Sequence, residues 1–242
     1  MAASGGEGGA FRFARTVLRP FVAVTTRHEW HGLRHVPRSG GCVVVANHLS
    51  YFDPLIVAQF LDAAGRAPRF LGKANLFELP VLGALLANAG QIPVYRNTVD
   101  AAKALDAAIA AVHDGQCVVI YPEGTLTGSA DLWPTKGKTG AARVGLATGC
   151  PVVPVAHWGA QHILGSGQKV PRLLPPRTIQ VRAGGPIDLT PYRRGPATPE
   201  ALPAATAEIM DSIVALLAQI RSTNAPPRGG VGEQSPHRDG VS

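Results

Sequence analysis

The fold of this 242-residue chain is indicated most clearly by one stretch, CVVVANHLSYFDP at residues 42–54. Its first part, Cys42–Ala46, is a valine run, which is typical of a strand buried on both faces. Its last part, Asp53-Pro54, favours a helix start because the fixed φ of proline suits the first helical turn. We therefore expect Asp53 to be the N-cap of that helix and Leu49–Phe52 to form a turn. A buried strand followed closely by a helix is typical of α/β proteins.

The same alternation continues to the end of the chain. The expected strands after Cys42–Ala46 are Phe70–Lys73, Gln91–Tyr95, Cys117–Tyr121, Val152–Ala156 and Thr178–Arg182. The expected helices are Leu55–Gly65, Leu76–Ala89, Val99–His113, Gly137–Thr148 and Pro199–Arg221. This pattern predicts one α/β domain with a mainly parallel central sheet flanked by helices, over residues 36–222.

The two ends of the chain have a different composition. Residues 1–10 and 223–242 are rich in Gly, Pro and polar residues, and we expect both to be disordered. Between the first of these and the domain, residues 11–35 are interpreted as an amphipathic membrane-associating segment. In it Phe13, Val17, Phe21 and Val24 recur at helical spacing, and arginines lie on the other side. A helix that simply packs on the domain is the alternative.

Charge and composition narrow the possible functions. The net charge is +7, with 45% hydrophobic and 16% charged residues, which excludes a highly charged disordered chain. A basic surface suits anionic lipid or phosphorylated ligands. No basic helix with interleaved aromatics or zinc-finger signature indicates nucleic acid as a partner. His28, His31 and His35 are interpreted as a solvated cluster, so no metal site is predicted.

No membrane-spanning helix or secretory signal is evident from the sequence. The longest stretch without Asp, Glu, Lys or Arg, Val144–Gln168, contains two prolines and several glycines. It therefore does not match the roughly 20 mostly apolar residues that cross a bilayer. We expect a cytoplasmic protein that binds peripherally to the cytoplasmic face of the cell membrane.

The first candidate site is His48 with Asp53, directly after the first predicted strand. Catalytic groups in parallel sheets gather at the carboxyl ends of strands. Five residues are too far apart to share one face of a regular helix, so the pair meets only if Leu49–Phe52 turns. A carboxylate beside an imidazole fixes its tautomer and stabilises the imidazolium, which makes a competent general base. A histidine that is merely hydrogen-bonded at a helix start is the alternative.

Two further strand ends carry polar residues. Arg96 follows Gln91–Tyr95 and has the geometry to clamp a phosphate with two parallel hydrogen bonds, or it is an ordinary surface arginine. Glu123-Gly124-Thr125 follow Cys117–Tyr121, where glycine permits a sharp turn and close approach of a ligand. A plain turn with a capping threonine is the alternative there. Val152–Val155, with Pro151 before it and Pro154 within it, indicates an edge strand or a shaped wall rather than direct chemistry.

Taken together and in this order, these four segments resemble the motifs of the glycerolipid acyltransferase family, over roughly residues 36–189. Within the family the chain is similar to the 1-acylglycerol-3-phosphate acyltransferases. The resemblance implies that His48 and Asp53 are the catalytic pair and that Arg96 binds the phosphate of the acceptor. It also implies that Glu123, Gly124 and Thr125 shape the acceptor pocket and that Val152–Val155 contacts the acyl donor.

One departure from the family pattern concerns the acceptor. The third motif usually continues with Arg and Ser, whereas this chain has Leu126 and Thr127. A cation expected at the acceptor head group is therefore missing, and Lys73, Lys136 or Lys138 is left to supply it. We include Lys73 among the substrate-binding candidates.

The resemblance implies transfer of a fatty acyl group from acyl-CoA or acyl-carrier protein to the sn-2 hydroxyl of 1-acylglycerol-3-phosphate, giving phosphatidic acid for phospholipid biosynthesis. No cofactor or metal is implied, because the thioester donor already carries the activated acyl group. The alternatives are a different lysophospholipid or glycolipid acceptor, and a non-catalytic peripheral lipid-binding module. The apolar helix Leu76–Ala89 is expected either to bound an acyl tunnel or to form core.

Overall fold

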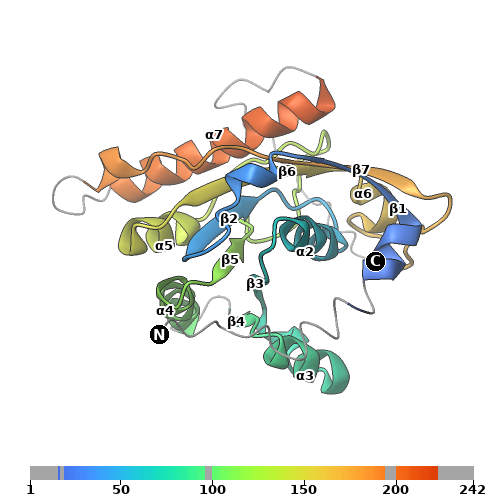
Figure 1. Cartoon of the computed structure of the whole chain (residues 1–242), viewed down its shortest axis with the longest axis horizontal. Coiled ribbons are helices and arrows are strands. Elements are labelled where there is room, and N and C mark those ends of the chain that lie inside the picture. The colour runs from blue at the N-terminus through green and yellow to red at the C-terminus, as the bar shows by residue number, and fades with distance from the viewer. Residues whose placement is uncertain (1–15, 17–18, 96–99, 194–199, 223–242) are drawn as a thin grey trace, which may run out of the picture.

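The computed structural model describes residues 16, 19–95, 100–193 and 200–222. A seven-stranded sheet, ordered β1-β7-β6-β2-β5-β3-β4, runs through the domain (Figure 1). Every neighbouring pair of strands is parallel except β6 and β7. The strands are β1 (Thr26–His31), β2 (Cys42–Ala46), β3 (Pro68–Lys73), β4 (Ile92–Val94), β5 (Cys117–Ile120), β6 (Val152–Trp158) and β7 (Arg177–Ala183).

Helices cover both faces of the sheet. Successive side chains of a strand point to opposite faces, and β2 shows the consequence. Val44 packs in the core under α2 (Asp53–Ala63), and Val43 and Val45 pack under the helices of the other face. Those helices are α4 (Asp100–His113), α5 (Gly140–Thr148) and α7 (Ala201–Arg221), and the remaining helices are α3 (Pro80–Asn88) and α6 (Gln161–Leu164). The predicted mainly parallel α/β architecture is confirmed.

Strand β1 was not predicted, and it corrects the expected domain boundary. Thr26–His31 pairs in parallel with β7 at the edge of the sheet, so these residues belong to the domain rather than to a membrane-associating segment 11–35. An edge strand buries only alternate side chains, and Trp30 is partly buried while Arg27 and Glu29 are exposed. Such a strand lacks the continuous apolar run by which the central strands are identified.

The chain before β1 is helical at residues 19–25, where Val22 is fully buried and Phe21 and Val24 are exposed. Gln59 donates a hydrogen bond to the carbonyl of Arg19, which ties this turn to α2. The helix thus packs on the domain along at least one side. Phe13 and Val17, the first half of the predicted apolar face, lie outside the described residues.

Helix α7 is the one helix among the described residues that is long and apolar enough to cross a bilayer. It also lies along the sheet, with Ile209, Ile213 and Leu217 fully buried. The extensive packing of α7 on β6 explains this composition, because a helix that covers a sheet is apolar on its inner face (Figure 1).

Candidate active site

The polar candidates converge at one edge of the sheet because of the strand order. Strands β6, β2, β5 and β3 are parallel neighbours in that sequence, so their carboxyl ends share an edge. His48 follows β2, Glu123 follows β5 and Lys73 closes β3. This edge is where ligands bind in open parallel sheets. Arg96, two residues beyond the end of β4, lies outside the described residues.

His48 and Asp53 are in direct contact. His48 Nδ1 lies 2.9 Å from Asp53 Oδ2, and the turn between them brings this about. Asp53 begins α2 and is not its N-cap, which is Phe52, so the expected cap position is wrong by one residue. Instead the carboxylate folds back and accepts hydrogen bonds from the backbone N–H groups of Leu49, at 2.6 Å, and Ser50, at 2.8 Å.

This contact determines which ring nitrogen of His48 is free to act. An ionised carboxylate only accepts hydrogen bonds, so Nδ1 carries the proton and Nε2 carries the lone pair. The Asp53 side chain is fully buried, whereas the His48 side chain is 18% exposed and within reach of a substrate. The arrangement is that of a general base whose conjugate acid is stabilised by a buried negative charge.

Glu123 and Thr127 contact the backbone of His48. One carboxylate oxygen accepts the hydroxyl of Thr127 at 2.8 Å and lies 3.4 Å from the backbone N–H of His48, while Thr127 N–H donates to the carbonyl of His48 at 2.7 Å. Burial raises the pKa of Glu123, and the hydrogen bonds from Thr127 and His48 oppose that rise. Both oxygens lie within hydrogen-bond distance of the Thr127 hydroxyl, so the geometry gives Glu123 a positioning role, and its contact with substrate stays a prediction.

Tyr121 forms the platform beneath the imidazole. Its ring stacks on that of His48 with centroids 4.2 Å apart, and Phe70 continues the stack at 6.3 Å. The Tyr121 hydroxyl is buried and has no hydrogen-bond partner among the described residues. Burial raises its pKa well above the ordinary value, and the Asp53 charge adds to the rise. A neutral aromatic face against the ring favours the protonated imidazole that forms during proton transfer.

Asn47 and His157 were not predicted and hold the base of the site together. His157 N–H donates to Asn47 Oδ1 at 3.0 Å, and Asn47 Nδ2 donates back to the carbonyl of His157 at 3.0 Å. His157 Nε2 lies 2.8 Å from the carbonyl of Asn47 and 3.7 Å from Asp53 Oδ2. These contacts join the ends of β2 and β6 and hold the imidazole of His157 beside the buried carboxylate.

The turn at Gly124 leaves room for a lysine. Gly124 has φ +69°, and a Cβ built there would lie 3.1 Å from two side-chain carbons of Lys138 and 3.3 Å from its Nζ. Lys138 also donates its backbone N–H to the carbonyl of Pro122 at 2.8 Å. Leu126 lies two residues after Gly124 in the same loop. Lys138 is therefore the lysine that the described structure places against the third motif, while Lys73 and Thr125 are exposed at the same edge.

Helix α3 differs from the other helices in what it exposes. Of its residues only Gly83 is buried, although the helix is almost entirely apolar. Val81 is 83% exposed and Leu82 39%, and before the helix Leu76 is 38% and the N-cap Leu79 is 48% exposed. Of the two alternatives for Leu76–Ala89, the one in which it forms core is wrong, because the helix projects from the sheet instead of covering it (Figure 1). The acyl tunnel stays a prediction.

Within the described residues no group of three His, Cys, Asp or Glu side chains is placed to hold a metal ion. His28 contacts Trp30 edge-on at 4.9 Å between ring centroids. His31 and His35 line a separate cavity with no carboxylate.

Comparison with known proteins agrees with this geometry. A family model described as Acyltransferase matches residues 27–158, which is more than half of the chain and contains His48, Asp53 and Glu123. The chain therefore belongs to the Acyltransferase family.

Two relatives that match the chain are acyltransferases of 1-acyl-sn-glycerol-3-phosphate. A chloroplastic 1-acyl-sn-glycerol-3-phosphate acyltransferase of Brassica napus, BAT2, is 32% identical over 143 residues, which cover 57% of this chain and 39% of that protein. A 1-acyl-sn-glycerol-3-phosphate acyltransferase of Borreliella burgdorferi is 29% identical over 125 residues, covering 51% of this chain and 48% of that protein. The matched region is thus less than half the length of either relative.

Among solved structures, the 1-acyl-sn-glycerophosphate acyltransferase PlsC from Thermotoga maritima superimposes with a TM-score of 0.67 at 20% identity. The superposition covers 89% of this chain and 81% of that one, so the two share a fold.

Proposed function

We propose that this protein transfers a fatty acyl group from a thioester donor, acyl-CoA or acyl-carrier protein, to the sn-2 hydroxyl of 1-acylglycerol-3-phosphate. The product is phosphatidic acid, a precursor of phospholipids. The observation that carries the proposal is the 2.9 Å contact between His48 Nδ1 and Asp53 Oδ2 at the carboxyl edge of the sheet. Membership of the Acyltransferase family and the similarity to acyltransferases of 1-acylglycerol-3-phosphate support it.

The chemistry follows from the free nitrogen of His48. Its Nε2 removes the proton of the acceptor hydroxyl while that oxygen attacks the thioester carbonyl carbon. The C–O bond forms, the C–S bond breaks, and the imidazolium returns its proton to the departing thiolate. Asp53 stabilises the positive ring, and proton transfer of this kind contributes about 10²–10⁴-fold to the rate. The thioester is already activated, so the proposal requires no cofactor or metal.

For the acceptor phosphate, the proposal places Lys138 where other family members carry an arginine. Its ammonium lies against the turn at Gly124, and Leu126 provides no charge there. No ion pair is recorded for Lys138 within the described residues, so its charge is available for a phosphate. Lys73, exposed at the end of β3, and Arg96 remain predicted partners of the same group.

The substrate assay also tests the lysine. Purified protein is mixed with palmitoyl-CoA and 1-acylglycerol-3-phosphate, and release of free thiol is followed. We expect turnover, and we expect Lys138→Gln to raise KM for this acceptor by about 10–100-fold, the effect of about 1.5–3 kcal/mol for a hydrogen bond to a charged group. KM for monoacylglycerol, which has no phosphate, should not change.

Lys136→Gln is the matched control, because Lys136 is exposed two residues earlier and is not among the atoms nearest to Gly124. An unchanged KM in Lys138→Gln would remove Lys138 from the phosphate site. Thiol release only with a different lysophospholipid or with a glycolipid would replace the proposed acceptor, an alternative that Leu126 favours. No release with any acceptor would refute the enzymatic function itself.

The substrates are lipids, so the site has to face a bilayer. We propose that α3 with Leu76 forms the docking face, since these exposed apolar side chains follow directly on Lys73 at the active edge. Apolar residues insert at the interface, and the neighbouring cation favours anionic head groups. This places the protein peripherally on the membrane, at its cytoplasmic face, with the site opening toward the lipid.

Val81→Asp tests this face. The side chain is 83% exposed, so the substitution leaves the core intact, while a charge at the interface opposes insertion. We expect co-sedimentation with phosphatidylglycerol-containing vesicles to weaken at least fivefold. Ala215→Asp, at an exposed position of α7 on the other side of the sheet, adds the same charge and should bind as the unmodified protein does. Equal binding of both variants would contradict the proposed docking face.

A further inference from the structure

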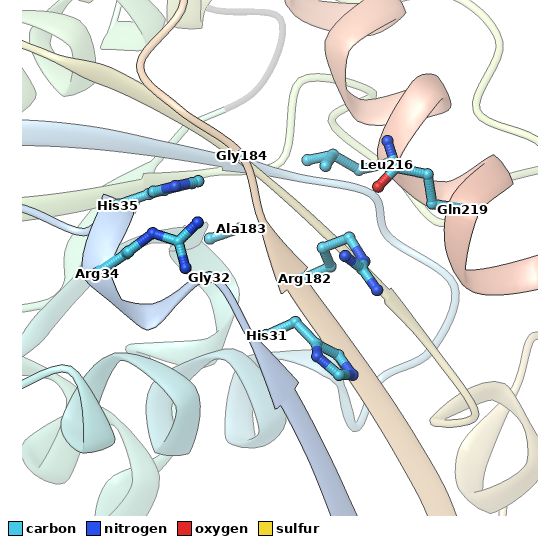
Figure 2. A pocket seen from close by; sticks show the side chains of 9 residues that line it. All are labelled: His31, Gly32, Arg34, His35, Arg182, Ala183, Gly184, Leu216 and Gln219. Carbon is cyan, nitrogen blue, oxygen red and sulfur yellow. The ribbon is translucent and has the colours of Figure 1, made fainter.

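A second basic site lies at the opposite edge of the sheet from His48. Strand β7 runs antiparallel to β6, and β1 runs parallel to β7, so the carboxyl ends of β1 and β7 point away from the active edge. There, a half-open cavity of about 280 Å³ is bounded by residues of β1 and its following turn, the end of β7, and α7 (Figure 2).

The lining of this cavity carries positive charge and no acid. Arg34 and Arg182 contribute guanidinium groups, His31 and His35 contribute imidazoles, and Gln219 adds an amide, with no Asp or Glu among the lining residues. For the part of the chain that the structure describes, no ion pair is recorded for either arginine. Two guanidinium groups at one cavity without a counter-ion repel each other, and a bound anion relieves that repulsion.

Within the part of the chain that the structure describes, two buried polar atoms of the lining residues have no hydrogen-bond partner. They are His35 Nδ1 and Arg182 Nε, which belong to side chains on different segments of the lining. A buried polar group without a partner costs free energy, and native proteins leave few of them. A guanidinium donates hydrogen bonds and an imidazole donates from both nitrogens when it is protonated, so the basic side chains of the lining suit an oxygen-rich anion.

The backbone around the cavity is held firmly. Gly32 has φ +76°, and a Cβ there would lie 2.1 Å from the carbonyl oxygen of Ala183, so only glycine allows the turn to press on β7. His31 is in register with Arg182, and Gly184 N–H donates to the carbonyl of Pro154 at 2.9 Å. The basic side chains therefore project from a preformed frame, which lowers the entropic cost of binding a ligand.

We propose that this cavity is a second site that binds a phosphoryl group, separate from the acyl-transfer site. Arginine binds phosphate through two parallel hydrogen bonds, which is the contact the cavity offers from Arg34 and Arg182. The ligand is either a soluble phosphate ester or the phosphate of a lipid head group. Because the cavity is at the other edge of the sheet, its occupation does not depend on the chemistry at His48.

Pyrophosphate is the probe that tests this site. Long-range ¹H–¹⁵N spectra of the full chain are recorded during the titration. The imidazole signals of His31 and His35, assigned through His31→Gln and His35→Gln, report on the cavity alone. We expect saturable shifts of these signals. Arg34→Gln and Arg182→Gln should each weaken the apparent affinity at least tenfold, while Arg38→Gln, which removes an exposed arginine outside the lining, leaves it unchanged.

The source of the phosphate is distinguished by two further titrations. If monomeric dihexanoyl phosphatidic acid shifts the same signals at a lower concentration than glycerol 3-phosphate does, the ligand is the head group of a lipid. If the two affinities are equal, the ligand is a soluble phosphate ester. Unmoved His31 and His35 signals, or an Arg34→Gln affinity equal to that of Arg38→Gln, would overturn the proposal. Because Arg34 is exposed, Arg34→Gln should fold normally even if Arg182→Gln does not, so the test does not rest on Arg182→Gln alone. Neither outcome bears on acyl transfer.

Discussion

His48→Ala is expected to lower kcat for thiol release by about 10²–10⁴-fold, the contribution of a positioned general base. KM for 1-acylglycerol-3-phosphate should change little, because the proposed phosphate partner is Lys138 and not His48. The fold should survive, since the His48 side chain is partly exposed and Asp53 keeps its hydrogen bonds from Leu49 and Ser50. Steady-state kinetics and a thermal unfolding curve measure both effects.

His113→Ala is the control for this variant, because His113 is an exposed histidine at the end of α4 and has no contact with the site. It should retain the activity of the unmodified protein. If His48→Ala turned over at more than a tenth of the unmodified rate with its fold intact, another group would have to be the base.

Asp53→Ala should be damaging in two ways. The carboxylate is fully buried and its Oδ2 meets His48 and two backbone N–H groups. Removing it leaves these donors unpaired, and each buried donor left without a partner costs about 1–3 kcal/mol. We therefore expect a lower denaturant midpoint together with a loss of kcat of about 10²–10⁴-fold.

Asp53→Asn separates the two effects. An amide oxygen still accepts from Leu49 and Ser50, so most of the free energy of unfolding should be kept. The negative charge beside the imidazole is gone, so kcat should fall nearly as far as in Asp53→Ala. An Asp53→Asn protein with the unmodified kcat would show that the charge of Asp53 has no part in the reaction.

The central strands were predictable because they are buried on both faces. Val43, Val44 and Val45 belong to an uninterrupted apolar run. Such a run predicts a buried strand even when the strands that pair with it are not known. Strand β1 has a charged or exposed residue at every second position and was missed. Its place in the sheet depends on pairing with β7, about 150 residues later, which local pattern does not encode.

The pair His48 and Asp53 was predictable because its geometry is local. A turn ending at Asp53-Pro54 is enough to bring the two side chains together. The prediction that Asp53 is the N-cap of α2 was wrong, because its carboxylate turns back and accepts hydrogen bonds from Leu49 and Ser50. Which backbone groups a short side chain selects depends on the path of the loop, and that path is set by the tertiary structure.

The remaining parts of the site depend on contacts between distant segments. Asn47 and His157 are 110 residues apart and meet only because β2 and β6 are neighbours. No feature of the sequence pointed to a role for His157 in the site, because a single histidine at the end of a valine-rich strand resembles a core residue. Likewise the sequence left three lysines as candidates for the acceptor phosphate, and only the structure shows that Lys138 lies against Gly124 of the third motif.

The central claim, that His48 and Asp53 act as one catalytic unit, is tested most directly by a double-mutant cycle. The measurement is kcat/KM for palmitoyl-CoA and 1-acylglycerol-3-phosphate with the unmodified protein, His48→Ala, Asp53→Asn and the double variant. If Asp53 acts only through the imidazole, the double variant loses no more than His48→Ala alone. Losses that multiply in the double variant would show two independent contributions and would contradict the mechanism.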